Sequence, residues 1–167
     1  TEVSKESSDI ILQDDRFFTI VKAISEGRRI FGNIRKSILF LLCCNLSEVF
    51  TVLFALLFRL PAILLPLQIL WINLITDVLP ALSLALDPPE PGSMRKPPMP
   101  RSEDILTGRH HRLIFTYGSI MTLGVFAVTF AALARHPGDL ENATAMGFHA
   151  MVFSQLLFVF NVRDHSL

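Results

Sequence analysis

Apolar residues form four long runs along the chain, each interrupted at only a few positions. The runs cover residues 37–58, 60–86, 113–134 and 143–162. At a rise of 1.5 Å per residue, helices over the first three are long enough to cross about 30 Å of hydrocarbon, and the fourth is just adequate. The pattern therefore predicts an all-α fold, a polytopic membrane helix bundle with four transmembrane helices.

The segment before the first run has a different pattern. Residues 16–36 place apolar side chains at helical spacing and charged side chains elsewhere on the wheel, which predicts an amphipathic stalk helix entering the membrane. Gly27 and Gly32 weaken this helix and mark where a break or bend can occur. Residues 8–15 predict a short cytosolic strand that leads into an acidic turn.

Polar side chains interrupt the second run at residues 71–80. On a helix, Asn73, Thr76 and Asp77 stand at i, i+3 and i+4 and share one face. A carboxylate inside a bilayer is costly and usually marks an ion path or a proton relay. Pro80 has no N–H, so the carbonyl of Thr76 loses its helical partner and is free to act as a ligand.

A second polar pair lies in the first run, where Asn45 and Glu48 are three residues apart. If the two spans face each other, Glu48 and Asp77 supply two negative charges in an oxygen-rich shell, which is the environment that hard cations such as Ca²⁺ prefer. The alternative interpretation is a buried polar cluster that only holds the helices together.

Composition and charge support a membrane protein. Hydrophobic residues make up 51% of the 167 residues, and mean hydropathy is +0.48. Basic residues concentrate before the first span, between the second and third, and after the fourth, so both ends of the chain and the loop over 87–111 are predicted to be cytosolic. That loop is rich in proline, which favours an extended spacer. The sequence shows no Gly-rich phosphate loop and no nucleophile–base pattern, so we expect neither catalytic nor cofactor-binding residues in it.

The order of the motifs resembles a known family. Ser-Asp-Ile-Ile-Leu-x-Asp-Asp at 8–15, Ile-x-Glu-Gly-Arg at 24–28, Asn-x-x-Glu at 45–48 and Asn-Leu-x-Thr-Asp-x-x-Pro-Ala at 73–81 are similar to P-type cation-transporting ATPases. The resemblance is greatest to the type II, sarco/endoplasmic reticulum-like calcium pumps. It covers essentially the whole chain and includes the Met-Arg-Lys-Pro-Pro stretch at 94–98.

The resemblance implies a division of the chain into parts of a pump. Those parts are the end of the cytosolic phosphorylation domain (1–27), the stalk and transmembrane helix 5 (28–60), transmembrane helix 6 (61–86), the Pro-rich cytosolic loop (87–111), transmembrane helix 7 (112–135), a short outside loop (136–142), transmembrane helix 8 (143–162) and the start of a cytosolic loop (163–167).

The resemblance also implies a set of metal ligands from three spans. These are Asn45, Glu48, Asn73, Thr76, Asp77 and Gln155. Asp77 matches the position that bridges two calcium sites in the family. Gln155 departs from it, because sarcoplasmic-type calcium pumps have a glutamate there. An amide offers an oxygen but adds no negative charge and carries no proton, so Gln155 is either a ligand or only a hydrogen-bonding residue between helices.

The function implied is that of the ion-binding membrane part of an ATP-driven cation pump, with Ca²⁺ as the expected cation and protons as the counter-ion. The alternatives are another hard cation (Na⁺, K⁺ or Mn²⁺), or a non-catalytic four-helix scaffold or regulator. The phosphorylated aspartate motif is not in this sequence, so we expect a longer parent chain that binds ATP and Mg²⁺ outside this part. Expected partners are the lipid bilayer and the remaining helices and cytosolic domains of the same pump, with no nucleic acid.

Overall fold

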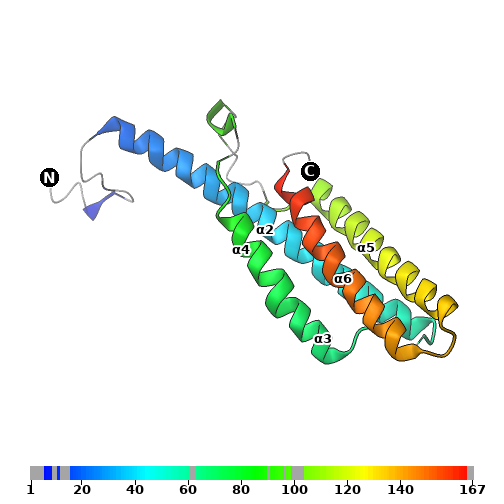
Figure 1. Cartoon of the computed structure of the whole chain (residues 1–167). Helices are drawn as coiled ribbons and strands as arrows, with labels where there is room; N and C mark the ends of the chain where they lie inside the picture. Colours follow the sequence, from blue (N-terminus) through cyan, green and yellow to red (C-terminus); the bar gives the residue numbers. More distant parts are fainter. Residues whose placement is uncertain are drawn as a thin grey trace.

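The computed structural model describes residues 6–8, 11, 16–60, 63–89, 91–95, 97–98 and 104–164. Within these ranges the regular structure is entirely helical (Figure 1). The elements are α2 (Phe17–Leu57), α3 (Pro66–Trp71), the π-helix η1 (Ile72–Asp77), α4 (Val78–Ala85), the short 3₁₀-helix η2 (Ser93–Arg95), α5 (Gly108–Arg135) and α6 (Leu140–Arg163). The strand predicted over 8–15 lies almost wholly outside the described residues.

Helix α2 joins the predicted stalk to the first span. It runs for 41 residues, and neither Gly27 nor Gly32 interrupts it. Its N-terminal half projects beyond the other helices, and its C-terminal half lies among them (Figure 1). One continuous helix therefore connects the projecting half to residues inside the bundle.

The second span is shorter than the run over 60–86 predicts, and it is not a uniform helix. Helical structure begins at Pro66, which occupies the first turn, where proline is tolerated because its missing N–H has no helical partner. The Gln68 side chain accepts a hydrogen bond from the backbone N–H of Leu65 at 2.9 Å and closes this end. The π-helix then occupies Ile72–Asp77, the segment that holds the polar side chains, before α4 restores the α-helical pattern.

Helix α6 begins earlier than the predicted loop over 136–142 implies. The carboxylate of Asp139 accepts a hydrogen bond from the backbone N–H of Asn142 at 3.0 Å, which caps the helix and lets it start at Leu140. Gly138 adopts φ +93° in the preceding turn, a conformation that favours glycine. The connection between α5 and α6 is therefore only residues 136–139.

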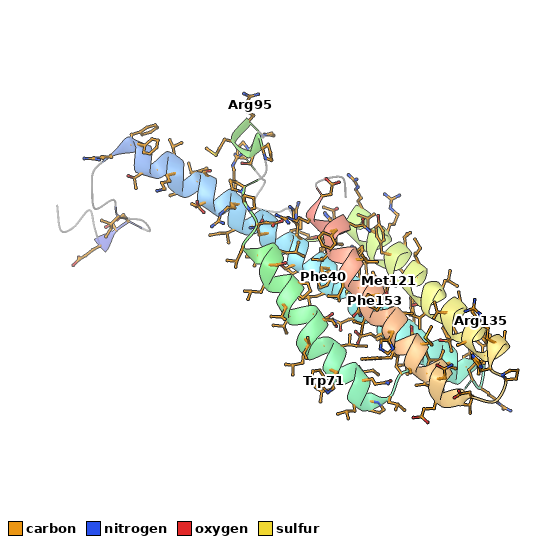
Figure 2. All side chains as sticks on the ribbon, viewed as in Figure 1. Phe40, Trp71, Arg95, Met121, Arg135 and Phe153 are labelled. Carbon is orange, nitrogen blue, oxygen red and sulfur yellow. The ribbon has the colours of Figure 1, made fainter. Side chains whose placement is uncertain are left out.

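Two buried apolar clusters hold the bundle together, one toward each end. The first cluster includes Phe40, Cys43, Cys44, Leu84, Met121 and Phe158. The second cluster includes Ala55, Ile63, Ile72, Val125 and Met151. Figure 2 shows Phe40 and Met121 within the bundle. Both cysteines are free and buried, as expected of small packing residues.

The outer surface of the bundle is apolar as well. One stripe of α3, η1 and α4 leaves large apolar side chains more than half exposed at helical spacing: Leu67, Leu70, Leu74, Val78 and Leu82. Trp71 lies on the same outward side (Figure 2). Four helical segments in the described part of the chain are long and apolar enough to cross a membrane. The predicted all-α polytopic bundle is thus confirmed.

Candidate cation site

A layer of polar side chains lies between the two apolar clusters. On α2, Glu48 falls between Cys44 of one cluster and Ala55 of the other. Gln155 on α6 falls between Met151 and Phe158 in the same way. The polar residues of η1 lie between Ile72 and Leu84. Three helices therefore bring their polar side chains to one depth, with apolar packing above and below.

Glu48 is at the centre of this layer and is 4% exposed. Its two carboxylate oxygens accept hydrogen bonds from different helices: Gln155 Nε2 donates to Oε1 and Asn73 Nδ2 donates to Oε2, both at 2.9 Å. Hydrogen bonds to a charged group are stronger than those between neutral groups, so these bonds tie α2 to α6 and to η1. A single carboxylate thus links the three helices.

Gln155 and Thr76 extend the network. Gln155 is fully buried, and its Oε1 lies 3.3 Å from the hydroxyl of Thr76. That hydroxyl also donates to the carbonyl of Ile72 at 2.6 Å, one turn back. The amide of Gln155 therefore uses its donor toward Glu48 and its acceptor toward Thr76.

Asp77 differs from Glu48 in having no such partners. It is 2% exposed, and among the described residues neither of its carboxylate oxygens has a hydrogen-bond partner. Its neighbour Thr76 lies 3.3 Å from Gln155, which donates to Glu48, so both acids belong to the same layer. A buried carboxylate without donors is costly, and a bound cation or a proton would offset that cost. Asp77 is consequently the most evident open ligand position.

The π-helix accounts for the way Thr76 and Asp77 both turn inward. A π-turn inserts an extra residue into the helical repeat and is often found at functional sites. Pro80 follows within one turn and cannot donate a hydrogen bond to the carbonyl of Thr76. Thr76 and Asp77 are both buried, whereas their neighbours Leu74 and Ile75 are exposed.

Five of the six predicted ligands meet in this layer, and Asn45 does not. Its side chain is exposed on α2, away from the network around Glu48.

Sequence reasoning missed the buried hydroxyls beside the layer. Thr122 of α5 donates to the carbonyl of Ser47 at 3.1 Å, and Ser47 lies 3.5 Å from the sulfur of Met151. A threonine in a span without charged residues gives only a weak signal in the sequence.

The donor set is typical of hard-cation chemistry. Carboxylate, amide and hydroxyl oxygens are the acceptor groups of the layer. The described residues contain no group of three or more His, Cys, Asp or Glu side chains that could hold a metal ion, so amides and hydroxyls would have to complete any ligand set. The apolar exterior, the four long helices and this buried oxygen-rich layer define an integral membrane protein of the polytopic helical class.

Comparison with known proteins identifies the family. The model of the family "Cation transporting ATPase, C-terminus" matches residues 61–167. The chain is 40% identical to calcium-transporting ATPase 1 of Bacillus cereus, over 99% of this chain and 20% of the relative. It is 39% identical to a calcium-transporting ATPase of Bacillus subtilis, over 99% of the chain and 19% of the relative. It is 37% identical to the endoplasmic reticulum-type calcium-transporting ATPase 4 of Arabidopsis thaliana, over 93% of the chain and 15% of the relative.

The chain therefore belongs to the cation-transporting ATPase family, which confirms the resemblance inferred from its motifs. It spans a fifth or less of the length of these relatives. The match begins at residue 61 and includes η1, α5 and α6, so most of the polar layer lies within the matched region.

Proposed function

We propose that this chain is the ion-binding membrane part of an ATP-driven pump that transports Ca²⁺ and returns protons. The observation that carries the proposal is the buried carboxylate of Asp77, which has no hydrogen-bond donor among the described residues and lies in the same polar layer as a second buried carboxylate, Glu48. Two adjacent negative charges balance one divalent cation, and their oxygens are of the type that Ca²⁺ takes. The named activity of the relatives, calcium transport by ATPases, supports the choice of ion.

The amide side chains give the site two states. In the present arrangement Asn73 and Gln155 donate their N–H groups to Glu48. An amide also carries an acceptor oxygen, so rotation about its terminal bond would present that oxygen to a cation held by Glu48 and Asp77. Entry of the cation would replace two amide donors by one metal charge, and departure would restore the hydrogen bonds or leave the acids protonated.

The remaining predicted ligands fit the same scheme. Thr76 contributes a hydroxyl and, because of Pro80, a carbonyl without a helical partner. Asn45 faces away from the layer, on the exposed side of α2. We propose that Asn45 becomes a cation ligand when a further helix of the pump packs against this side of α2. Gln155 is the least charged member of the set, and it serves either as a ligand or as the donor that orients Glu48.

The long helix α2 provides the connection to ATP hydrolysis. Residues 1–27 are proposed to complete the cytosolic phosphorylation domain, and ATP and Mg²⁺ would bind elsewhere in the parent chain. Movement of the projecting half of α2 would displace Glu48 relative to Asp77, because the same helix carries both the stalk and Glu48. Both ends of the chain and the loop over 87–111 are proposed to face the cytosol, consistent with the position of their basic residues.

A pump for a different hard cation is the second candidate. By the resemblance to sarcoplasmic-type calcium pumps, Gln155 occupies a position where those pumps have a glutamate. The described layer therefore holds only two carboxylates. A site with less negative charge suits a single divalent ion or monovalent ions such as Na⁺ and K⁺. The cargo must therefore be tested directly.

The test is phosphorylation of the complete pump by ATP, titrated separately with Ca²⁺, Na⁺, K⁺ and Mn²⁺. The wild type should require Ca²⁺, and Asp77→Asn should abolish the response because it removes the open ligand charge. Asp164→Asn is the matched control, since this carboxylate is exposed at the end of α6. Phosphorylation that responds to another cation would reassign the cargo, and phosphorylation indifferent to all four would contradict the proposed site.

A further inference from the structure

Asp87, just beyond the C-terminal end of α4, forms a second meeting point of the same three helices. Its side chain is 9% exposed, and its two carboxylate oxygens face two different positively charged side chains. Arg163 Nε of α6 lies 3.1 Å from Oδ1, and Lys36 Nζ of α2 lies 3.8 Å from Oδ2. Lys36 Nζ also donates to the carbonyl of Arg163 at 3.3 Å.

The backbone at this point is held as firmly as the side chain. The last carbonyls of a helix have no partner within it. Asn33 of α2, which is 4% exposed, donates through Nδ2 to the carbonyls of Ala85 at 3.1 Å and Asp87 at 2.8 Å. One turn further along α2, Ser37 donates to the carbonyl of Ala81 at 3.0 Å. The end of α4 is therefore attached to one face of α2.

Each helix that supplies the polar layer also supplies one group to this junction of Lys36, Asp87 and Arg163. Lys36 precedes Glu48 by twelve residues on α2, and Arg163 follows Gln155 by eight on α6. Asp87 follows Asp77 by ten on the third helix. At 1.5 Å per residue these separations are about 18, 12 and 15 Å, so all three groups lie beyond the layer in the same direction.

The apolar cluster around Phe40, Cys44, Leu84 and Phe158 fills the space between the junction and the layer. Close-packed side chains and rigid helices transmit small displacements. A shift of α2 at the junction would therefore displace both α4 and α6, because the Asp87 carboxylate connects all three helices.

We infer that Asp87 is a positioning residue for cation binding. Its carboxylate fixes the relative axial positions of α2, α4 and α6, and so sets the geometry in which Glu48, Asp77 and Gln155 meet. The inference rests on the proposed cation site but concerns a group that does not bind the transported cation. Loss of its charge should weaken cation binding although every ligand side chain is chemically unchanged.

The test compares Asp87→Asn with wild type in the complete pump, by the Ca²⁺ concentration that half-saturates phosphorylation from ATP. We expect that concentration to rise about threefold to tenfold. The maximal amount of phosphoenzyme per folded pump should be unchanged, and Asp87→Glu should restore most of the affinity. A merely structural role would lower the maximal amount and leave the half-saturating concentration as it was.

Arg163→Gln provides an independent variant if Asp87→Asn does not fold, because the Arg163 side chain is 61% exposed. Its effect should have the same direction as that of Asp87→Asn and be no larger, because Asp87→Asn also loses Lys36. The two changes together should do little more than Asp87→Asn alone, since both break the ion pair between Asp87 and Arg163. Asp164→Asn, which removes a neighbouring exposed charge, is the control.

The two proposals fail in different ways. Additive effects, or an unchanged half-saturating concentration in a pump that responds to Ca²⁺, would overturn the inference about Asp87 and leave the cation site standing. A wild-type pump without any response to cations would overturn both.

Discussion

Asp77→Asn should have opposite effects on stability and on cation binding. The wild-type carboxylate is 2% exposed, and both of its oxygens lack hydrogen-bond partners among the described residues. An unsatisfied buried polar group costs about 1–3 kcal/mol, and more when it is charged. Replacing the acid by an isosteric neutral amide removes the buried charge. In buffer alkaline enough to keep the cation-free acid ionised, the variant should therefore be more stable than the wild type by about 1–3 kcal/mol.

Calcium should reverse this order. A ligand present at 100 times its dissociation constant stabilises the form that binds it by about 2.7 kcal/mol. The wild type should gain that amount, and the variant should gain almost none because it has lost the open ligand. The wild type is thus expected to be the less stable protein in a chelator and the more stable, or at least equal, protein in saturating Ca²⁺.

The assay is thermal unfolding of the detergent-solubilised complete pump, followed by circular dichroism with and without Ca²⁺. Glu48→Gln is the matched comparison, because it removes the same charge from a carboxylate that accepts two hydrogen bonds at 2.9 Å. The NH₂ group of the new glutamine would face the NH₂ group of either Asn73 or Gln155, so one hydrogen bond would be lost. We therefore expect Glu48→Gln to be less stable than Asp77→Asn. If Asp77→Asn lowers cation-free stability as much as Glu48→Gln does, Asp77 is a structural residue and our reasoning is wrong.

Two further predictions concern packing and the network. Gly147→Ala should destabilise the pump by about 1–3 kcal/mol, because an added Cβ would lie 2.7 Å from Thr129 Oγ1. Gly124→Ala meets nothing within 4 Å and should be neutral or slightly stabilising; equal thermal stability of the two variants would contradict this interpretation. Gln155→Leu should cost about 1.5–3 kcal/mol of cation-free stability, because it removes the 2.9 Å hydrogen bond to Glu48. Unfolding in a chelator measures that cost, and a variant as stable as wild type would show that the bond contributes nothing.

Much of the fold was predictable because membrane helices are specified locally. The length of an apolar run decides whether a helix crosses a bilayer, and the four runs correspond to four helical segments of sufficient length and hydropathy. The helix ends depend on more than the apolar pattern. The caps formed by Gln68 and Asp139 depend on side-chain geometry that an apolar pattern does not reveal.

The cation site was predictable only in part, for a related reason. Helical spacing shows that Asn73, Thr76 and Asp77 share a face, because that relation lies within one segment. Whether this face meets Glu48 depends on how two helices are rotated and shifted against each other. Gln155 came from resemblance to the family rather than from any pattern in its own span, and no local signal indicated that it would donate to Glu48.

By itself the sequence determined the class of protein, the four spans and the residues able to bind a hard cation, since these follow from composition and from spacing along single helices. Only the tertiary structure decided which of those residues meet. Packing of the two apolar clusters brought Glu48, Asn73 and Gln155 to one depth and left Asn45 exposed. It also left Asp77 without a donor in the part of the chain that the structure describes, and it joined Asp87 to Lys36 and Arg163. These relations connect segments far apart in the chain, and the packing of helices against one another sets them.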